Sequence, residues 1–281
     1  MTLRSMTILD ELVDGVREDL AADRAACPES ELRARLADAP PTRSFAEAIR
    51  IPSGGRGAEG ARIRVIAEVK RASPAKGVIA EVFEPGAVAT RYEVGGAAAV
   101  SVLTERRRFL GHLDHLRSVR RAVNLPILRK EFIFDPYQVI EARVVGADAV
   151  LLIAAILCGN EIADLRAMAE ELGMDALVEV YDEEELDRVF GAGARLLGVN
   201  NRNLKTFETD SRHTIQVLSA VSPERRRNIV CISESGIFGW KDVAPIADAG
   251  VDAVLVGESL MRAASPEALL RELRGLDAGK L

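Results

Sequence analysis

The sequence predicts a (β/α)8 or TIM barrel, an α/β fold of eight parallel strands closed into a cylinder, with an N-terminal helical extension. Three observations predict this class: eight short apolar runs follow one another from residue 63, amphipathic stretches separate them, and the chain has 281 residues of which 48% are hydrophobic. Such a barrel uses about 250 residues as one domain. We therefore expect residues 61–281 to form the barrel domain and residues 1–60 to form helices that pack on its mouth.

The first sixty residues carry helix signals and no strand pattern. Thr7 can cap a helix over residues 8–20, where apolar residues recur at helical spacing. Pro28 suits the start of a second helix, and residues 44–49 can form a short third one. The glycine-rich residues 52–60 indicate a loop before the first strand.

Each predicted strand is followed by an amphipathic stretch typical of a helix, such as residues 160–172 and 182–190. A doubly wound sheet is the alternative, but its G-x-G-x-x-G fingerprint after the first strand is missing. The run Gly191-Ala192-Gly193 precedes a strand, which is the wrong context for a dinucleotide. The barrel is therefore favoured. Its strands are predicted at residues 63–70, 98–103, 126–130, 149–153, 176–180, 196–200, 229–233 and 253–256.

The composition limits the possible partners. A net charge of −6 argues against nucleic-acid binding, and the arginine triplets at 106–108 and 225–227 are too short to follow a phosphate backbone. The chain has no signal-peptide pattern and no run of the roughly 20 apolar residues that a membrane span needs. We expect a cytoplasmic protein that binds neither nucleic acid nor membrane, and a monomer rather than a homo-oligomer.

Metal and disulfide chemistry are not indicated by the cysteines and histidines. Cys27, Cys158 and Cys231 lie far apart and form no C-x-x-C pair. His112 and His115 could share a helix face, but no third ligand accompanies them. We expect neither a metal nor a cofactor.

Polar residues stand at the C-terminal ends of the predicted strands, where barrels of this class form active sites. Ile66, Glu68 and Lys70 share one face of the first strand because side chains alternate along a strand. A salt-bridge network that only closes the barrel mouth is the alternative, but buried charges are poor stabilisers. We expect these residues to converge on one cavity. They are Glu68, Lys70, Thr104, Glu105, Lys130, Glu179, Asn200, Glu234, Ser235 and Gly257.

Glycine-containing turns follow the last two strands, at Gly236 and at Gly257. Loops after these strands often bind phosphate through backbone N–H groups, and glycine lets the backbone approach the anion closely. Either glycine alone could serve a tight turn, but both at these strands favour a phosphorylated ligand. The carboxylate of Glu258 must then point away from the phosphate.

Six motifs stand in order along the chain: IAEVKRASPAKG at 66–77, SVLTE at 101–105, LRKEFI at 128–133, LVEV at 177–180, GVNNRNL at 198–204 and ISESGI at 232–237. Together they resemble the indole-3-glycerol phosphate synthase family, and the resemblance covers nearly all of the chain. Glu131 is a departure, since the family more often has Asp there. The family's reaction closes the pyrrole ring of 1-(2-carboxyphenylamino)-1-deoxyribulose 5-phosphate with loss of carbon dioxide and then water, a step of tryptophan biosynthesis that needs no cofactor.

The resemblance implies that Lys130 is the general acid for the ketone oxygen and that Glu179 transfers protons in the dehydration. Lys70 would hold the substrate carboxylate or phosphate, or share the acid role. Two ammonium groups in one cavity are expected to lower the pKa of at least one of them.

Further residues receive roles from the same resemblance. Arg202 would steady either Glu68 or the anthranilate carboxylate. The orienting residues would be Glu68, Asn200 and Glu234; the substrate-binding residues Arg202, Ser235, Phe109, Phe132, Leu151 and Leu204; and the phosphate-binding residues Ser73, Gly236, Gly257, Glu258 and Ser259.

Two other functions remain as alternatives. Phosphoribosylanthranilate isomerase is also a phosphate-binding barrel, but it commonly uses a Cys/Asp pair where this chain has Lys130 and Glu179. A non-catalytic barrel that binds a phosphorylated metabolite would be expected to lose Lys130 or Glu179 while keeping Gly236 and Gly257. Because all four residues are present, an enzyme is favoured.

Overall fold

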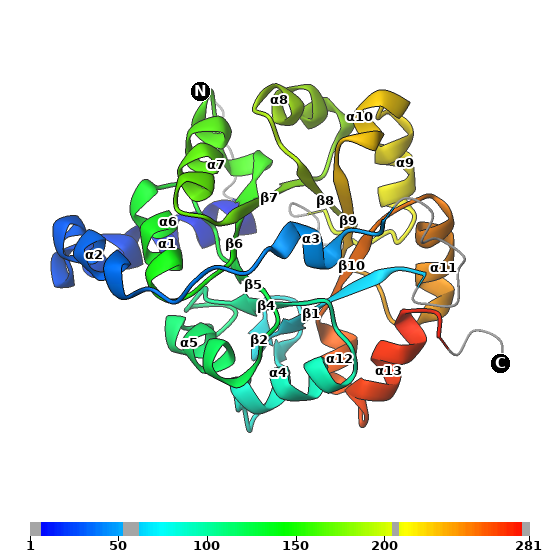
Figure 1. Cartoon of the computed structure of the whole chain (residues 1–281), viewed down its shortest axis with the longest axis horizontal. Coiled ribbons are helices and arrows are strands. Elements are labelled where there is room, and N and C mark those ends of the chain that lie inside the picture. The colour runs from blue at the N-terminus through cyan, green and yellow to red at the C-terminus, as the bar shows by residue number, and fades with distance from the viewer. Residues whose placement is uncertain (1–6, 53–61, 204–207, 277–281) are drawn as a thin grey trace.

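A closed barrel of parallel strands forms the centre of the computed structural model, which describes residues 7–52, 62–203 and 208–276 (Figure 1). The predicted TIM barrel is confirmed. Its strands are β1 (Arg64–Val69), β4 (Ala99–Leu103), β5 (Ile127–Lys130), β6 (Ala149–Ile153), β7 (Asp175–Val180), β8 (Leu196–Asn200), β9 (Val230–Glu234) and β10 (Ala253–Val256). Each strand pairs with the next one along the chain, and β1 closes the cylinder by pairing with both β4 and β10.

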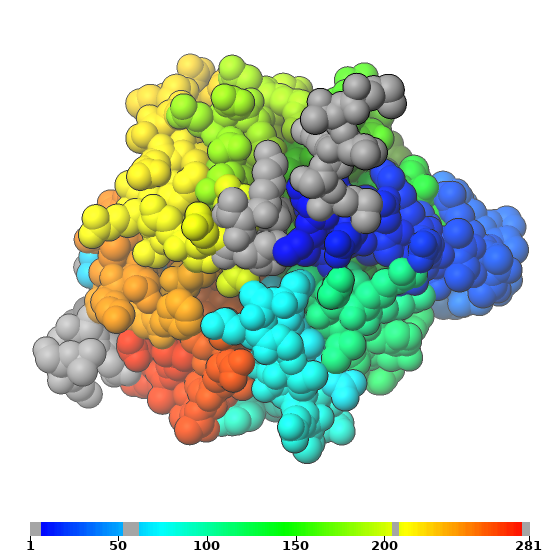
Figure 2. Space-filling model, turned by 180° about the vertical axis from the view of Figure 1, so that it is seen from behind, coloured from blue at the N-terminus to red at the C-terminus, as the bar shows by residue number. Residues whose placement is uncertain are grey.

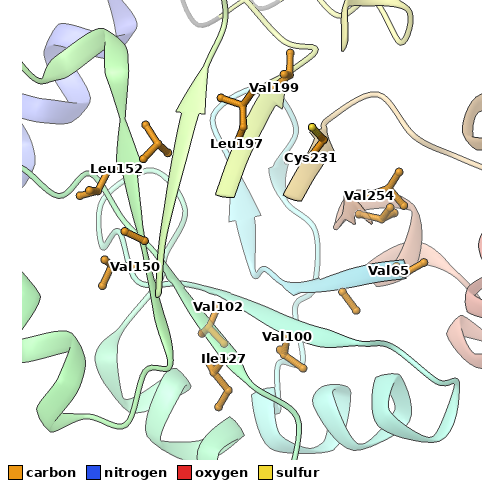
Figure 3. Close-up of a cluster of buried hydrophobic side chains, with 14 of the residues drawn as sticks. Val65, Val100, Val102, Ile127, Val150, Leu152, Leu197, Val199, Cys231 and Val254 are labelled. Carbon is orange, nitrogen blue, oxygen red and sulfur yellow. The ribbon is translucent and has the colours of Figure 1, made fainter. Parts of the chain in front are cut away.

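Side chains of the strands alternate between two apolar layers. Outward residues such as Val100, Val102 and Ile127 pack between the strands and the helices, and Figure 3 shows this outer layer on several strands. Inward residues such as Ile66 and Leu128 fill the barrel interior. Because the side-chain period is two, the next inward positions lie at the C-terminal ends of the strands, where charged residues take over.

Helices cover the outside of the barrel. The predicted helix at 160–172 is present, whereas the one at 182–190 is divided into a short 3-10 helix, η3 (Glu183–Glu185), and an α-helix. The outer helices are α4 (Pro85–Val94), α5 (Leu113–Ala122), α6 (Pro136–Val144), α7 (Glu161–Glu171), α8 (Leu186–Gly191), α9 (His213–Ser219), α10 (Pro223–Arg227), α11 (Trp240–Asp248), α12 (Glu258–Arg262) and α13 (Pro266–Leu273), with η2 (Ala154–Ile156) after β6.

A small hairpin after β1 was not predicted. It joins β2 (Ala72–Ser73) to β3 (Gly77–Val78), and Ser73 lies opposite Gly77. Gly77 has φ +64°, a left-handed conformation that glycine adopts without strain.

The first helix of the extension, α1 (Ile8–Ala26), lies over the C-terminal end of the barrel. Thr7 caps it, as predicted. Arg106, in the loop after β4, forms an ion pair of 2.7 Å with Asp23 of this helix, and Leu12 reaches the cavity described below. Figure 2 shows α1, in dark blue, on the face opposite to that of Figure 1.

The chain then passes along the side of the barrel. The segments α2 (Glu29–Ala34) and η1 (Arg35–Asp38) pack against α6. Leu20 and Leu32 are buried there together with Tyr137 and Ile140 of α6.

The third helix, α3 (Phe45–Ile49), closes the opposite end of the barrel. Its Phe45 and Ile49 are fully buried against the inner layer, and the N–H of Ala46 donates to Asp175, the first residue of β7, at 2.9 Å. Figure 1 shows α3 in front of the strands. The expectation that the whole extension packs on the mouth is therefore wrong for α3, because its apolar pattern shows which face is buried but not at which end of the barrel.

The expected domain boundary at residue 60 stays a prediction, because residues 53–61 and the expected glycine-rich loop at 52–60 lie almost entirely outside the described residues. Of the helices that the structure describes, none has the length and hydropathy that crossing a membrane requires.

Candidate active site

A cavity lies at the C-terminal ends of the strands, under α1. Most of the residues predicted from the sequence line it, although they come from all eight strands or the loops that follow them. These residues are Glu68, Lys70, Ser73, Phe109, Lys130, Phe132, Leu151, Glu179, Asn200, Arg202, Glu234, Ser235, Gly236, Gly257 and Glu258.

Lys130 stands at the centre of the charged residues. Its Nζ atom lies 3.3 Å from Oε2 of Glu179 and also contacts Oε2 of Glu234. Asn200 donates from Nδ2 to the other oxygen of Glu179 at 3.1 Å, which fixes the orientation of that carboxylate. The second oxygen of Glu234 is buried without a hydrogen-bond partner among the residues described. One ammonium is thus shared by two carboxylates from two other strands, β7 and β9.

Burial and neighbouring charges shift the pKa values of groups in this cluster. Burial by itself lowers the pKa of Lys130, but the carboxylates of Glu234 and Glu179 outweigh it and keep the pKa above its ordinary value. Burial raises the pKa of Glu234 to about 7; the charge of Lys130 opposes this rise and that of Glu179 adds to it. The sequence led us to expect a lowered pKa for at least one of the two lysines. For Lys130 the direction is the opposite, because its acidic neighbours outweigh the effect of burial.

The other ammonium, Lys70, has a carboxylate partner of its own. Its Nζ atom lies 2.7 Å from Oε1 of Glu68, on the same face of β1, as the alternation predicted. Glycines make room for these groups: a Cβ atom on Gly257 would collide with Glu68, and one on Gly198 would collide with Glu234. Gly198 was missed as a site residue, and its signal was a glycine at an inward position of a buried strand.

The turn after β9 has an uncommon backbone conformation. Ser235 has φ +70° and Gly236 has φ +75°, so two consecutive residues are left-handed at the cavity wall. Nearby, the carboxylate of Glu258 lies 3.4 Å from Arg262 and 3.8 Å from Lys76.

An apolar wall faces the charged cluster. Phe109, Phe132 and Leu151 contribute to it as predicted, and Leu12 of α1 adds to it. Leu12 was missed because the sequence showed only that it belongs to the apolar stripe of a helix. The predicted Leu204 lies outside the described residues.

Three predicted residues do not line this cavity. The hydroxyl of Ser259 donates to the carbonyl of Ile237 at 3.0 Å, below the cavity wall. Thr104 faces outward and donates to Glu131 at 2.7 Å. The buried carboxylate of Glu105 accepts the N–H groups of residues 107, 108 and 109, each at 2.8 Å. The expectation that Thr104 and Glu105 join the ring is wrong. Thr104 continues the outward face of Val102, and the carboxylate of Glu105 is used by the backbone of the loop that follows β4.

Arg202 lines the cavity next to Asn200. Its backbone N–H donates to Oδ1 of Asn200 at 3.0 Å, while its side-chain Nε is buried and has no partner in the described part of the chain. Across those same residues, no group of three or more His, Cys, Asp or Glu side chains is arranged to hold a metal ion.

A TIM barrel with a cluster of ammonium and carboxylate groups at its C-terminal end defines an enzyme of the barrel class. A family model described as indole-3-glycerol phosphate synthase matches residues 9–273. The chain is 47% identical over 268 residues to the indole-3-glycerol phosphate synthase of Rhodococcus jostii (strain RHA1), with 95% of each chain covered. It is 49% identical over 269 residues to that of Micrococcus luteus, with 96% of this chain and 97% of the relative covered. The chain belongs to the indole-3-glycerol phosphate synthase family.

Solved structures share the fold at low sequence identity. Thiamine phosphate pyrophosphorylase from Pyrococcus furiosus is 17% identical with a TM-score of 0.57, covering 78% of this chain and 98% of that chain. 3-Hexulose-6-phosphate synthase from Salmonella typhimurium is 15% identical with a TM-score of 0.61, covering 78% and 100%. These similarities concern the barrel alone.

Proposed function

We propose that this protein converts 1-(2-carboxyphenylamino)-1-deoxyribulose 5-phosphate to indole-3-glycerol phosphate, the lyase step of tryptophan biosynthesis in which a ring closes and carbon dioxide and water leave. The observation that carries the proposal is the position of Lys130, whose ammonium contacts both Glu179 and Glu234 in the barrel cavity. An ammonium that contacts two carboxylates in different environments can take part in general acid–base catalysis, because the environments set different pKa values.

Lys130 acts first, as the general acid. When the aryl carbon bonds to the ketone carbon, negative charge develops on the ketone oxygen, and Lys130 supplies the proton that converts it to a hydroxyl. Its raised pKa ensures that the proton is present before the substrate arrives. The substrate carboxylate then leaves as carbon dioxide, and the electrons of the broken carbon–carbon bond restore the aromatic ring.

Glu179 acts in the dehydration, transferring a proton as the new hydroxyl leaves as water. Asn200 keeps this carboxylate turned towards Lys130 through its 3.1 Å hydrogen bond. Glu234, with a pKa of about 7, can hold or release a proton near neutral pH and so adjusts the charge around Lys130.

The remaining residues bind the substrate. Lys70, oriented by Glu68, and Arg202 carry the positive charges for the carboxylate and the phosphate. The turns at Gly236 and Gly257 offer backbone N–H groups to the phosphate, together with Ser73. The apolar wall holds the aromatic ring, and α1 limits the access of water to the cavity.

The isomerase alternative meets an obstacle in the cavity itself. A Cys/Asp pair would require a cysteine there, and none of Cys27, Cys158 and Cys231 lines it. The monomeric state and the cytoplasmic location stay predictions.

An assay of the purified protein tests the proposal. We expect the carboxyphenylamino ribulose phosphate to be consumed with a rise in indole fluorescence. Phosphoribosylanthranilate, offered as the control substrate, is expected to remain unchanged. Binding of the first compound without turnover would support a non-catalytic barrel, and turnover of the second would support the isomerase; either result contradicts the proposal.

A further inference from the structure

The turn at Ser235 and Gly236 needs support from its surroundings. A left-handed conformation suits glycine but is uncommon for serine, and it persists only where neighbouring groups hold it. Ser235 has φ +70° and is followed by Gly236 at φ +75°, and both residues line the cavity. Some group behind the turn must therefore fix its backbone.

Asn201 lies behind this turn, and its side chain is fully engaged. The residue is 1% exposed and does not line the cavity. Its Nδ2 donates to the carbonyl oxygen of Ser235 and to the hydroxyl of Ser233, both at 3.0 Å. Its Oδ1 accepts from the N–H of Thr214 at 3.0 Å and from the Thr214 hydroxyl at 2.8 Å. The amide thus ties the end of β9 to the start of α9.

Two adjacent asparagines at the end of β8 bind different groups. Asn200 points into the cavity and orients Glu179, whereas Asn201 points away from the cavity and bonds to the carbonyl of Ser235 in the turn. The backbone after β8 is joined to the end of β9 at this point, because the N–H of Asn201 donates to the carbonyl of Glu234 at 2.8 Å. A buried amide whose donors and acceptor are all used has one rigid orientation.

We propose that Asn201 is a positioning residue for the substrate phosphate: by holding the carbonyl of Ser235, it keeps the left-handed turn in place and the N–H of Gly236 directed into the cavity. This inference rests on the proposed function, in which that turn contacts the phosphate. Asn201 acts through the turn and touches no reacting atom, so its loss affects binding rather than the chemical step.

The decisive variant is Asn201→Asp, which keeps the size of the side chain and replaces the donor to Ser235 by an oxygen. We expect KM for the phosphorylated substrate and Kd for inorganic phosphate to rise about tenfold, equal to about 1.4 kcal/mol. We expect kcat to stay within about threefold of the wild type, a split that a general loss of structure does not produce.

The matched control is Thr214→Val. This variant removes one hydroxyl that donates to Asn201. The N–H of Thr214 still donates to Oδ1 of Asn201, and the hydrogen bond from Asn201 to Ser235 is unchanged. We expect a lower melting temperature and a Kd for inorganic phosphate within about twofold of the wild type.

Ser235→Gly provides a second test, because glycine adopts the left-handed conformation without help. In that background, Asn201→Ala is expected to change the Kd for inorganic phosphate much less than it does when Ser235 is present. An equal change in both backgrounds would overturn the inference, as would an unchanged Kd in Asn201→Asp or a failure of both Asn201 variants to fold. If the wild type neither turns over the substrate nor binds phosphate, the proposed function itself fails.

Discussion

The outer and inner faces of β5 each carry a cation, Arg129 buried and Lys130 partly buried, and the two environments differ. On the outer face, Arg129 uses all of its nitrogen atoms. Nε donates to Thr104 at 3.2 Å, Nη1 to the carbonyl of Gln138 at 2.8 Å, and Nη2 to Glu141 at 2.7 Å. This arginine joins β5 to α6, and each of its three side-chain nitrogens makes a hydrogen bond.

On the inner face, Lys130 has more carboxylate around it than it can neutralise. It contacts Glu179 and Glu234, yet one oxygen of Glu234 has no partner among the described residues. Burial raises the pKa of Glu234 to about 7, so this cluster responds to pH.

A structural ion pair and a functional one differ here in how completely their polar groups are bonded. Both lie inside the protein, and burial alone does not separate them, since Arg129 and Glu234 are each almost inaccessible. A structural network satisfies its polar groups completely, whereas a reactive cluster leaves some of them free for the substrate. Because Arg129 and Lys130 are neighbours in sequence, they allow this distinction to be tested at one place in the fold.

The largest expected effect is on turnover. Lys130→Met removes the general acid, and we expect kcat, followed by indole fluorescence, to fall by about two to four orders of magnitude. The fold is expected to survive, because Glu234 can take up a proton in place of the lost ammonium. Circular dichroism checks the fold, and near-normal turnover would remove Lys130 from the acid role.

The next effect is on stability. Arg129→Met leaves the buried carboxylate of Glu141 unpaired, and we expect the free energy of unfolding to fall by about 3–5 kcal/mol in urea titrations. The folded fraction should retain nearly normal kcat. As a control, adding Glu141→Gln should recover part of the loss. A drop in kcat as large as that of Lys130→Met would abolish the distinction between the two faces.

A pH effect of intermediate size follows from Glu234. Its pKa is about 7 in the folded protein and about 4.3 in an unfolded chain. At pH values between these two pKa values, the folded state binds a proton that the unfolded state has released. The free energy of unfolding therefore falls as pH rises, by at most about 1.4 kcal/mol per pH unit. We expect wild-type stability to decrease relative to Glu234→Gln from about pH 5 to about pH 7. Parallel curves for the two proteins would contradict a titration of Glu234 in this range.

The smallest expected effect concerns an ion pair near the surface. Arg106→Gln breaks the contact with Asp23 of α1, where both side chains are partly exposed. We expect the free energy of unfolding to fall by less than about 1 kcal/mol, and less still at high salt. A loss as large as that of Arg129→Met would mean that α1 is held chiefly by its charges rather than by its apolar stripe.

Much of the fold could be predicted because strand signals are local. The runs predicted at 149–153, 196–200 and 253–256 coincide with β6, β8 and β10. The β2–β3 hairpin was not predicted, since strands of two residues are too short to show alternation. The position of α3 also escaped prediction, because it depends on contacts with residues more than one hundred positions away.

The members of the site could be predicted better than their interactions. Strand alternation correctly brought Glu68, Lys130, Glu179, Asn200 and Glu234 to one cavity. It could not show which charges pair across the barrel, since pairing depends on the angle between strands. For that reason the raised pKa of Lys130 was not foreseen. Asn201, which faces away from the cavity, was overlooked.

The helix that seals the floor of the barrel has a consequence for how the chain folds during synthesis. Residues 43 and 46 bond to Asp148 and Asp175, which follow them by 105 and 129 positions. Phe45 and Ile49 leave the ribosome early, yet the surface that buries them exists only after β7 has been translated. Contacts across such long stretches form late, because the intervening loop must first be ordered. This segment, synthesised before all the strands of the barrel, is therefore among the last parts of the fold to reach its place.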